Sequence, residues 1–189
     1  QMFVAEWTYP RIHRAYIEKV GDEYQGACFP FIEGRGLRKG SLRLAFSPDG
    51  DLYVAQTSRI WGVGEGIQRV IWTGTTPMDI QEMRLTKDGF DLIFTKAVDP
   101  QTAADPADYS MIHYYYRYHG AYGSPKTDVT AVRISAVAIS ADGYRISLHL
   151  KRLVQGRIYE LRPGKRIRSK DGESLATRLA AYTLNRLRK

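Results

Sequence analysis

The sequence predicts an all-β protein with two β-rich halves. Three observations support this fold class: short apolar or alternating runs recur along the chain, Asp-Gly pairs separate several of them, and no long apolar stripe occurs at helical spacing. The chain has 189 residues, 43% of them hydrophobic. This length and composition suffice for one domain or for two small domains.

The first half consists of short strands joined by glycine-rich loops. Leu42–Phe46 and Leu52–Ala55 flank Asp49-Gly50, a pair suited to the positive φ of a tight hairpin turn. Composition shifts after the last of these loops, near residue 75. We therefore expect one domain over residues 1–76 and a second over residues 77–189.

The second half has the strand spacing of a small β-sandwich. Two hairpins are expected around Asp88-Gly89 and Asp142-Gly143, and later strands at residues 153–161 and 181–185. One short helical turn is expected near residues 174–180. Short strands separated by regular turn signals are typical of an immunoglobulin-like (Ig-like) β-sandwich.

A change of phase marks one strand of this predicted sandwich. Val132 and Ile134 alternate with polar residues, and Val137 and Ile139 then continue out of phase. A one-residue slip of this kind moves side chains to the opposite face of a sheet unless the strand bulges. We therefore expect a bulge near Ser135-Ala136.

Residues 109–118 are unusually rich in tyrosine and form an expected strand. Period two places Tyr114, Tyr116 and Tyr118 on one face and Tyr115, Arg117 and His119 on the other. The second face either packs against the first domain, makes ordinary cross-strand pairs, or binds a sugar by stacking. The candidate substrate-binding residues are Tyr115, Arg117, His119 and, in the following loop, Tyr122.

A loop in the first half carries a second set of candidates. Arg59 and Trp61 follow the end of a strand, where loop side chains often line a binding site, and they suit an anionic or planar ligand. The alternative is that Trp61 packs against a neighbouring sheet. The single cysteine, Cys28, lies in an apolar run and is expected in the core. No metal site and no catalytic motif is expected, because the four histidines and Cys28 lack ligand or nucleophile spacing.

The net charge of +8 is concentrated at one end of the chain. Residues 151–189 hold twelve Lys or Arg and three Asp or Glu, a net charge of +9, whereas residues 1–150 carry −1. A solvated basic sheet edge explains this pattern, and contact with an acidic partner or a polyanion is the alternative. No nucleic-acid-binding motif and no membrane span is present in the sequence, so neither partner is expected.

Several stretches together resemble a known family. Leu42–Val54 resembles a blade hairpin of secreted β-propellers of the soluble, pyrroloquinoline-quinone (PQQ)-type sugar dehydrogenase class, which oxidise glucose or sorbosone. Residues 2–7, 11–16 and 67–74 look like further blade strands. The second half resembles the Ig-like domain that follows such propellers, on Asp105–Tyr109, Ala121–Pro125, Ser140–Gly143, Leu153–Gly156 and Tyr182–Asn185.

The resemblance implies the C-terminal part of a larger extracytoplasmic oxidoreductase, with partial propeller blades followed by an Ig-like sandwich. No cofactor is expected in this chain, although the parent would hold PQQ and calcium, and Arg43, Arg59 and Trp61 are the candidate cofactor contacts. The chain would be non-catalytic on its own. It would act in domain docking to upstream propeller blades, to a cytochrome c domain, or to a polysaccharide held on the aromatic strand.

Overall fold

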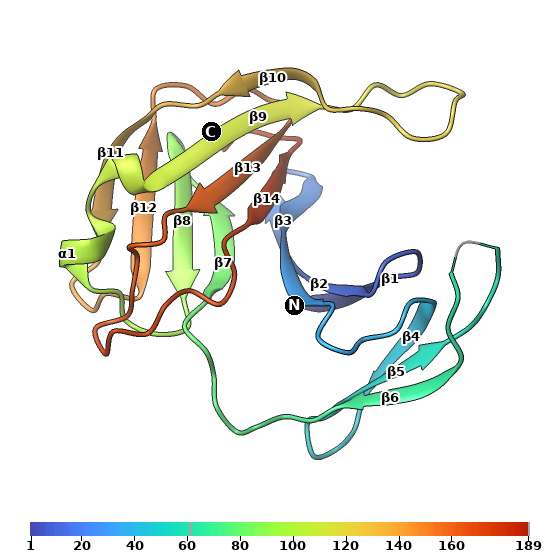
Figure 1. Cartoon of the computed structure of the whole chain (residues 1–189). Coiled ribbons are helices and arrows are strands. Elements are labelled where there is room, and N and C mark those ends of the chain that lie inside the picture. The colour runs from blue at the N-terminus through green and yellow to red at the C-terminus, as the bar shows by residue number, and fades with distance from the viewer. Residues whose placement is uncertain (61, 189) are drawn as a thin grey trace. The chain divides into compact units, whose positions relative to one another are not determined.

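The computed structural model describes residues 1–60 and 62–188 (Figure 1). Within these residues the chain forms fourteen strands and two one-turn helices, α1 (Pro100–Ala103) and η1 (Pro106–Asp108). The strand pairs with a defined register are antiparallel. The predicted all-β class is therefore confirmed.

The chain divides into two compact units, and the tip of one hairpin of the first unit belongs to the second unit. The first unit comprises residues 1–15 and 28–76, and the second comprises residues 16–27 and 77–189. The long hairpin formed by β2 (Arg11–Val20) and β3 (Glu23–Glu33) belongs to both, because its tip lies in the second unit.

The first unit contains β1 (Met2–Glu6) and the bases of β2 and β3, which pair in that order, and a three-stranded sheet. β1 pairs with the base of β2. The three-stranded sheet has the order β4 (Ser41–Phe46), β5 (Leu52–Gln56), β6 (Gly66–Val70). Gly50 at the β4–β5 turn has a φ of 88°, as the Asp-Gly signal predicts.

A small core holds the first unit together. Ile12, Leu52 and Val54 are buried, and the ring of Phe3 packs edge-on against Phe46 at 5.2 Å between centroids. Buried Asp51 accepts hydrogen bonds from the Arg69 guanidinium at 2.7 Å and from a backbone N–H. These bonds compensate the desolvation of its carboxylate, since a buried charge without partners is costly.

The propeller blades predicted for residues 1–76 are wrong. A propeller repeats four-stranded blades around a closed ring. The described strands instead form seven-, four- and three-stranded sheets that do not close into a ring. The alternating pattern of Leu42–Val54 specifies a hairpin correctly, but a hairpin signal is common to many β architectures.

Two antiparallel sheets build the second unit. The four-stranded sheet has the order β11-β12-β8-β7. The other sheet has the order β3-β14-β13-β9-β10, to which β3 contributes the tip of the hairpin. The strands of these sheets, besides β3, are β7 (Ile80–Leu85), β8 (Gly89–Phe94), β9 (Tyr109–Tyr115), β10 (Thr127–Ala131), β11 (Ile134–Ile139), β12 (Arg145–Leu150), β13 (Arg157–Pro163) and β14 (Ala180–Leu184).

Aromatic rings join the two sheets in the core of the second unit. The ring of Phe90 on β8 lies 5.2 Å from that of Tyr159 on β13 and 5.1 Å from that of Tyr182 on β14. All three side chains are fully buried. Tilted aromatic contacts at these separations add to the burial of large apolar surfaces, so this cluster ties one sheet to the other.

Local sequence signals predicted several details of the second unit. The register between β11 and β12 shifts between Ile134 and Ala136, which confirms the bulge expected there. The Asp-Gly pair at 142–143 forms the predicted turn, and Gly143 has a φ of 81°. The helical turn expected near residues 174–180 is wrong, because this segment is irregular until β14 begins.

Cys28, expected in the core, is exposed. Its neighbours on β3, Ala27 and Phe29, are both buried. Because adjacent side chains of a strand point to opposite faces, the burial of these two neighbours turns Cys28 outward. The prediction failed because an apolar run does not reveal which of its alternate positions faces the core.

Candidate functional site

The loop between β9 and β10, residues 116–126, presents aromatic side chains to solvent. Figure 1 shows it as an extended excursion beyond the ends of these two strands. The exposed fraction is 49% for Tyr116, 106% for Tyr118 and 100% for Tyr122. Arg117 and His119 are also exposed. Tyr116, Arg117, Tyr118 and His119, which were predicted on the two faces of a strand, thus lie on a loop, because β9 ends at Tyr115.

The base of this aromatic loop is anchored by a buried carboxylate. Lys126 Nζ lies 2.5 Å from Glu160 Oε2 and 4.5 Å from the centroid of the Tyr114 ring. Glu160 on β13 is buried and also accepts from the Arg162 guanidinium at 2.8 Å. Burial alone would raise the pKa of Glu160, but the bonds and charges of Lys126 and Arg162 outweigh it and lower this pKa.

Internal hydrogen bonds shape the aromatic loop. The backbone N–H of Arg117 donates to Ser124 Oγ at 3.1 Å, which joins the two arms of the loop. The N–H of Ala121 donates to Nδ1 of His119 at 3.2 Å. These bonds orient residues 117–124, in which the side chains of Tyr118 and Tyr122 are exposed to solvent.

Tyr115 differs from the other tyrosines of this segment. The guanidinium of Arg157 lies 4.8 Å from the centroid of its ring, and Arg157 Nη2 is 2.6 Å from Asp128 Oδ2. A cation over one face of the ring occupies a surface that a sugar would need. Tyr115 therefore contacts Arg157 at the base of the loop, and this face of its ring is not available for stacking on a sugar.

The candidate cofactor contacts lie in the first unit. Arg43 is exposed on β4 and donates to the carbonyl of Leu42 at 3.4 Å. Arg59 is exposed, and its backbone forms a bridge with Gly62. Trp61 lies outside the described residues. No hydrogen bond or ion pair joins Arg43 to Arg59 among the residues that the structure describes.

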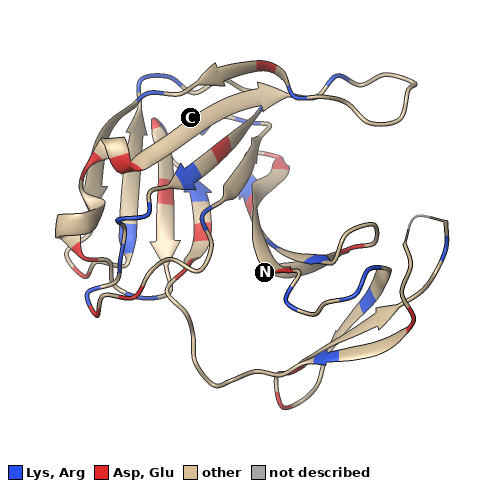
Figure 2. Ribbon diagram, viewed as in Figure 1, with Lys and Arg blue, Asp and Glu red and all other residues tan. Residues whose placement is uncertain are grey.

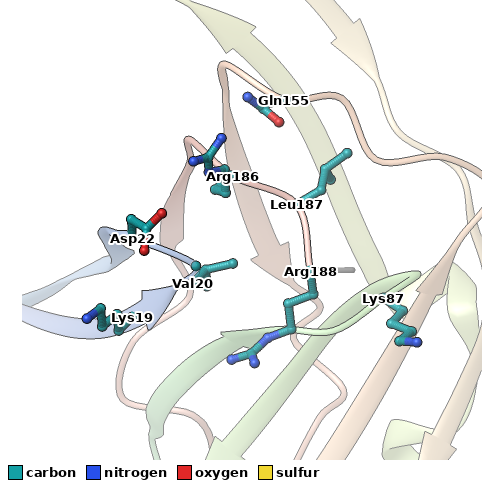
Figure 3. A pocket seen from close by; sticks show the side chains of 9 residues that line it. Lys19, Val20, Asp22, Lys87, Gln155, Arg186, Leu187 and Arg188 are labelled. Atoms are coloured by element: carbon teal, nitrogen blue, oxygen red, sulfur yellow. The ribbon is translucent and has the colours of Figure 1, made fainter.

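A basic pocket of about 700 Å³ lies in the second unit. Figure 3 shows its side chains, which come from the end of β2 and the β2–β3 turn, the β7–β8 turn, the β12–β13 loop and the segment after β14. Its cations are Lys19, Lys87, Arg186 and Arg188, and Asp22 is its acidic residue. The excess of basic residues at 151–189 is evident in the sequence. The pocket is not, because Lys19 and Lys87 lie far from residues 186–188 in the chain.

A second basic pocket, of about 500 Å³, lies in the same unit. Its cations are Arg133, Lys151 and Arg152, and its wall includes His113. The buried Nδ1 of His113 has no hydrogen-bond partner among the described residues. Burial lowers the pKa of His113, and the nearby charge of Arg157 lowers it further, so its imidazole is neutral at pH 7.

Many other cations of the second unit are already paired. Figure 2 shows Lys and Arg on strands and on connecting loops of residues 77–188. Arg157 pairs with Asp128, Arg162 with Glu160, and Arg166 lies 3.7 Å from Asp108. The formal charge of residues 151–189 therefore overstates the charge available to a partner.

Comparisons with known proteins identify neither a family nor a curated relative. No family model matches the chain. No curated protein matches it either. Among the residues described, no group of three or more His, Cys, Asp or Glu side chains is placed to hold a metal ion. No described helix is long and apolar enough to cross a membrane.

The solved structures that match are of a bacterial S-layer protein, SbsC. The crystal structure of its residues 31–844 is 21% identical, covers 58% of this chain and 14% of the SbsC chain, and has a TM-score of 0.44. Its N-terminal part is 20% identical, with 57% and 24% covered and a TM-score of 0.42. This chain thus spans less than a quarter of the SbsC chains that it matches.

The resemblance to PQQ-type sugar dehydrogenases is wrong. None of the matching chains is a propeller or a quinone-dependent dehydrogenase, and the sheets of this chain do not close into a propeller. The motifs behind the resemblance were short turn-and-strand patterns, which arise in many β proteins. The assignments that depended on it alone, PQQ and calcium in a parent enzyme and Arg43 as a cofactor contact, lose their basis.

Proposed function

We propose that this chain is an extracytoplasmic binding module that holds carbohydrate on its aromatic loop. The observation that carries the proposal is the full exposure of Tyr118 and Tyr122 on an anchored loop. Large aromatic side chains are usually buried, and aromatic faces left open in this way stack on the apolar face of a sugar ring.

The polar neighbours of these tyrosines suit the same ligand. Arg117 carries guanidinium donors and His119 carries ring nitrogens, and both side chains are exposed on the same loop. Carbohydrate recognition combines stacking surfaces with a few polar groups that bond hydroxyls, and a loop held at its base loses less entropy on binding. The ion pair of Lys126 with Glu160 therefore contributes to affinity indirectly.

Retention on insoluble polysaccharides tests the carbohydrate proposal. The full chain is expected to bind at least one neutral polysaccharide, and Tyr118→Ala and Tyr122→Ala are each expected to weaken retention about fivefold or more, since a stacking contact contributes on the order of 1 kcal/mol or more. Tyr24→Ala is the matched control, because Tyr24 is 70% exposed on the hairpin tip. Equal retention of all three variants would contradict the proposal.

We also propose a specific fold for the second unit. We infer that residues 77–189, completed by the hairpin tip 16–27, form an Ig-like sandwich. Two facing antiparallel sheets support this assignment, as does the hydroxyl of Tyr109, which donates to the carbonyl of Ala103 at 2.7 Å. A tyrosine bonded to the backbone a few residues upstream is a feature of Ig-like domains.

Domain docking is the second candidate function. Five pocket cations that have no side-chain partner among residues 1–60 and 62–188 favour it, because such charges attract an acidic surface and speed its encounter. The residues are Lys19, Lys87, Arg133, Lys151 and Arg152. Binding of an acidic protein that weakens as salt rises from about 0.05 to 0.5 M would support docking. Binding that does not depend on salt would contradict it.

The extracytoplasmic location is tested separately. Immunodetection in fractionated cells is expected to find the protein outside the cytoplasm. Recovery of the protein with the cytoplasmic fraction alone would contradict this part of the proposal.

A further inference from the structure

We infer that the two basic pockets form one docking site for an extended acidic peptide that also carries apolar side chains. This inference rests on the docking candidate and names the place and the chemistry of the partner. The loop 151–156, between β12 and β13, joins the pockets: Gln155 lines the first, and Lys151, Arg152 and Val154 line the second. A ligand that crosses this loop meets both pockets.

Two hydrogen bonds fix the shared loop. The backbone N–H of Val154 donates to the buried hydroxyl of Tyr159 at 2.7 Å. The N–H of Gly156 donates to the carbonyl of Leu184 on β14 at 2.8 Å. The loop is therefore held by both β13 and β14, and the pockets on its two sides keep a constant separation.

The segment after β14 is fixed in the same way. The side-chain oxygen of Gln25 accepts from the backbone N–H groups of Asn185 at 3.0 Å and Arg186 at 2.8 Å. Arg188 Nη2 lies 2.5 Å from Glu18 Oε2, and its Nε donates to the carbonyl of Leu85 at 2.7 Å. The wall of the first pocket is thus preorganised, which reduces the entropy lost on binding.

Only some of the cations that line the two pockets are available to a ligand. Arg188 is neutralised by Glu18, and Arg186 lies 3.9 Å from Glu23. Lys19 and Lys87 in the first pocket make no side-chain hydrogen bond or ion pair with any described residue. The same holds in the second pocket for Arg133, Lys151 and Arg152. Five free cations across two adjacent pockets favour a ligand with repeated negative charges.

Apolar side chains line both pockets between these cations. Val20 and Leu187 lie in the first pocket, and Val132 and Val154 lie in the second. A peptide that combines carboxylates with aliphatic side chains satisfies both kinds of surface. Single-stranded nucleic acid is held by a basic groove together with bases stacked on aromatic rings, and the described pocket linings contain no Phe, Tyr or Trp. An acidic polysaccharide supplies charge but no aliphatic side chains.

Fluorescence polarisation with synthetic peptides tests the site. The probe is a fluorescein-labelled peptide of alternating Glu and Leu, compared with peptides of alternating Glu and Ser and of alternating Gln and Leu. The full chain is expected to bind the Glu-Leu peptide at least about tenfold more tightly than either comparison peptide, which corresponds to about 1.4 kcal/mol. The same measurement with heparin and with a single-stranded oligonucleotide distinguishes the other polyanions.

Charge reversal in each pocket locates the binding. Lys87→Glu in the first pocket and Lys151→Glu in the second are each expected to weaken Glu-Leu binding about tenfold. Lys170→Glu is the control, because Lys170 is exposed in the same unit and lines neither pocket. The two-pocket site would be overturned if Lys170→Glu weakened peptide binding as much as the pocket variants do. It would also be overturned if only one of the two pocket variants weakened binding. Either result would leave the proposal of domain docking intact. Tighter binding of heparin or the oligonucleotide would overturn the peptide assignment, and no salt-sensitive binding of any acidic probe would overturn docking itself.

Discussion

The hydroxyl of Tyr182 donates a hydrogen bond to Oε1 of Glu18 at 2.7 Å, between residues that are 164 positions apart. Both groups are buried, and Glu18 also accepts from the backbone N–H of Leu85 at 2.7 Å. Gln25 Nε2 donates to the same hydroxyl at 2.9 Å. A polar network of the hairpin tip, β7 and β14 thus lies inside the second unit, where each unmet bond is costly.

Removal of this hydroxyl is expected to destabilise the protein. Tyr182→Phe keeps the ring contact with Phe90 but leaves Glu18 and Gln25 each short of a partner. The free energy of unfolding in urea is expected to fall by about 1–3 kcal/mol. Tyr24→Phe, which alters an exposed hydroxyl on the same hairpin, is expected to change it by less than about 0.5 kcal/mol. Equal effects would show that the network contributes nothing.

The hairpin tip is expected to be required for the second unit. A fragment of residues 77–189 lacks both Glu18 and Gln25, so its β14 edge and the segment after it lose their partners. Circular dichroism and urea unfolding are expected to show a fragment that is unfolded or several kcal/mol less stable than the same unit in the full chain. Addition of a peptide of residues 16–27 should restore part of the signal. A fragment as stable as the full chain would contradict this expectation.

A steric test is available on β8. A Cβ atom at Gly89 would lie 1.9 Å from the carbonyl oxygen of Leu148 on β12, so one strand would have to move. Gly89→Ala is expected to lower the free energy of unfolding by about 3 kcal/mol. Gly120→Ala in the aromatic loop is the control, because its Cβ would meet nothing within 4 Å. Two variants of equal stability would contradict the close packing of β8 and β12.

The carboxylate at the base of the aromatic loop is expected to give stability a pH dependence. The folded-state pKa of Glu160 lies below its ordinary value of 4.5, so its contribution is present above about pH 4.5 and is lost as pH falls through the folded pKa. Glu160→Gln is therefore expected to reduce the urea midpoint at pH 7, with a smaller difference from the parent near pH 3. Asp171→Asn, at an exposed turn, is the control for the loss of one surface carboxylate and should leave the urea midpoint at pH 7 nearly unchanged.

Short-range sequence signals predicted much of the second unit. The Asp-Gly pair at 142–143 and the phase change near Ser135 specify a turn and a bulge through local backbone geometry. The end of β9 was not predictable in this way, because tyrosines continue to alternate with polar residues past Tyr115. The strand stops there because its pairing with β10 begins only at Thr127.

The binding surfaces were predictable only in part. The tyrosine-rich segment was recognised, but which rings are exposed depends on where β9 ends and on Arg157, which covers Tyr115. The basic excess was recognised as well, yet the first pocket combines Lys19 and Lys87 with residues near the end of the chain. Contacts over such sequence separations are set by topology, which no local pattern encodes.

The hairpin tip also determines the order in which the protein can be completed during synthesis. Residues 16–27 leave the ribosome first among the parts of the second unit, whereas Tyr182 and Arg186 leave it only after the strands that lie between them in the sequence. A domain with this arrangement cannot fold vectorially from its N-terminus, and the open edge of β3 remains available for wrong pairing until β14 arrives. Nascent chains that stop before β14 are therefore substrates for chaperones and proteases.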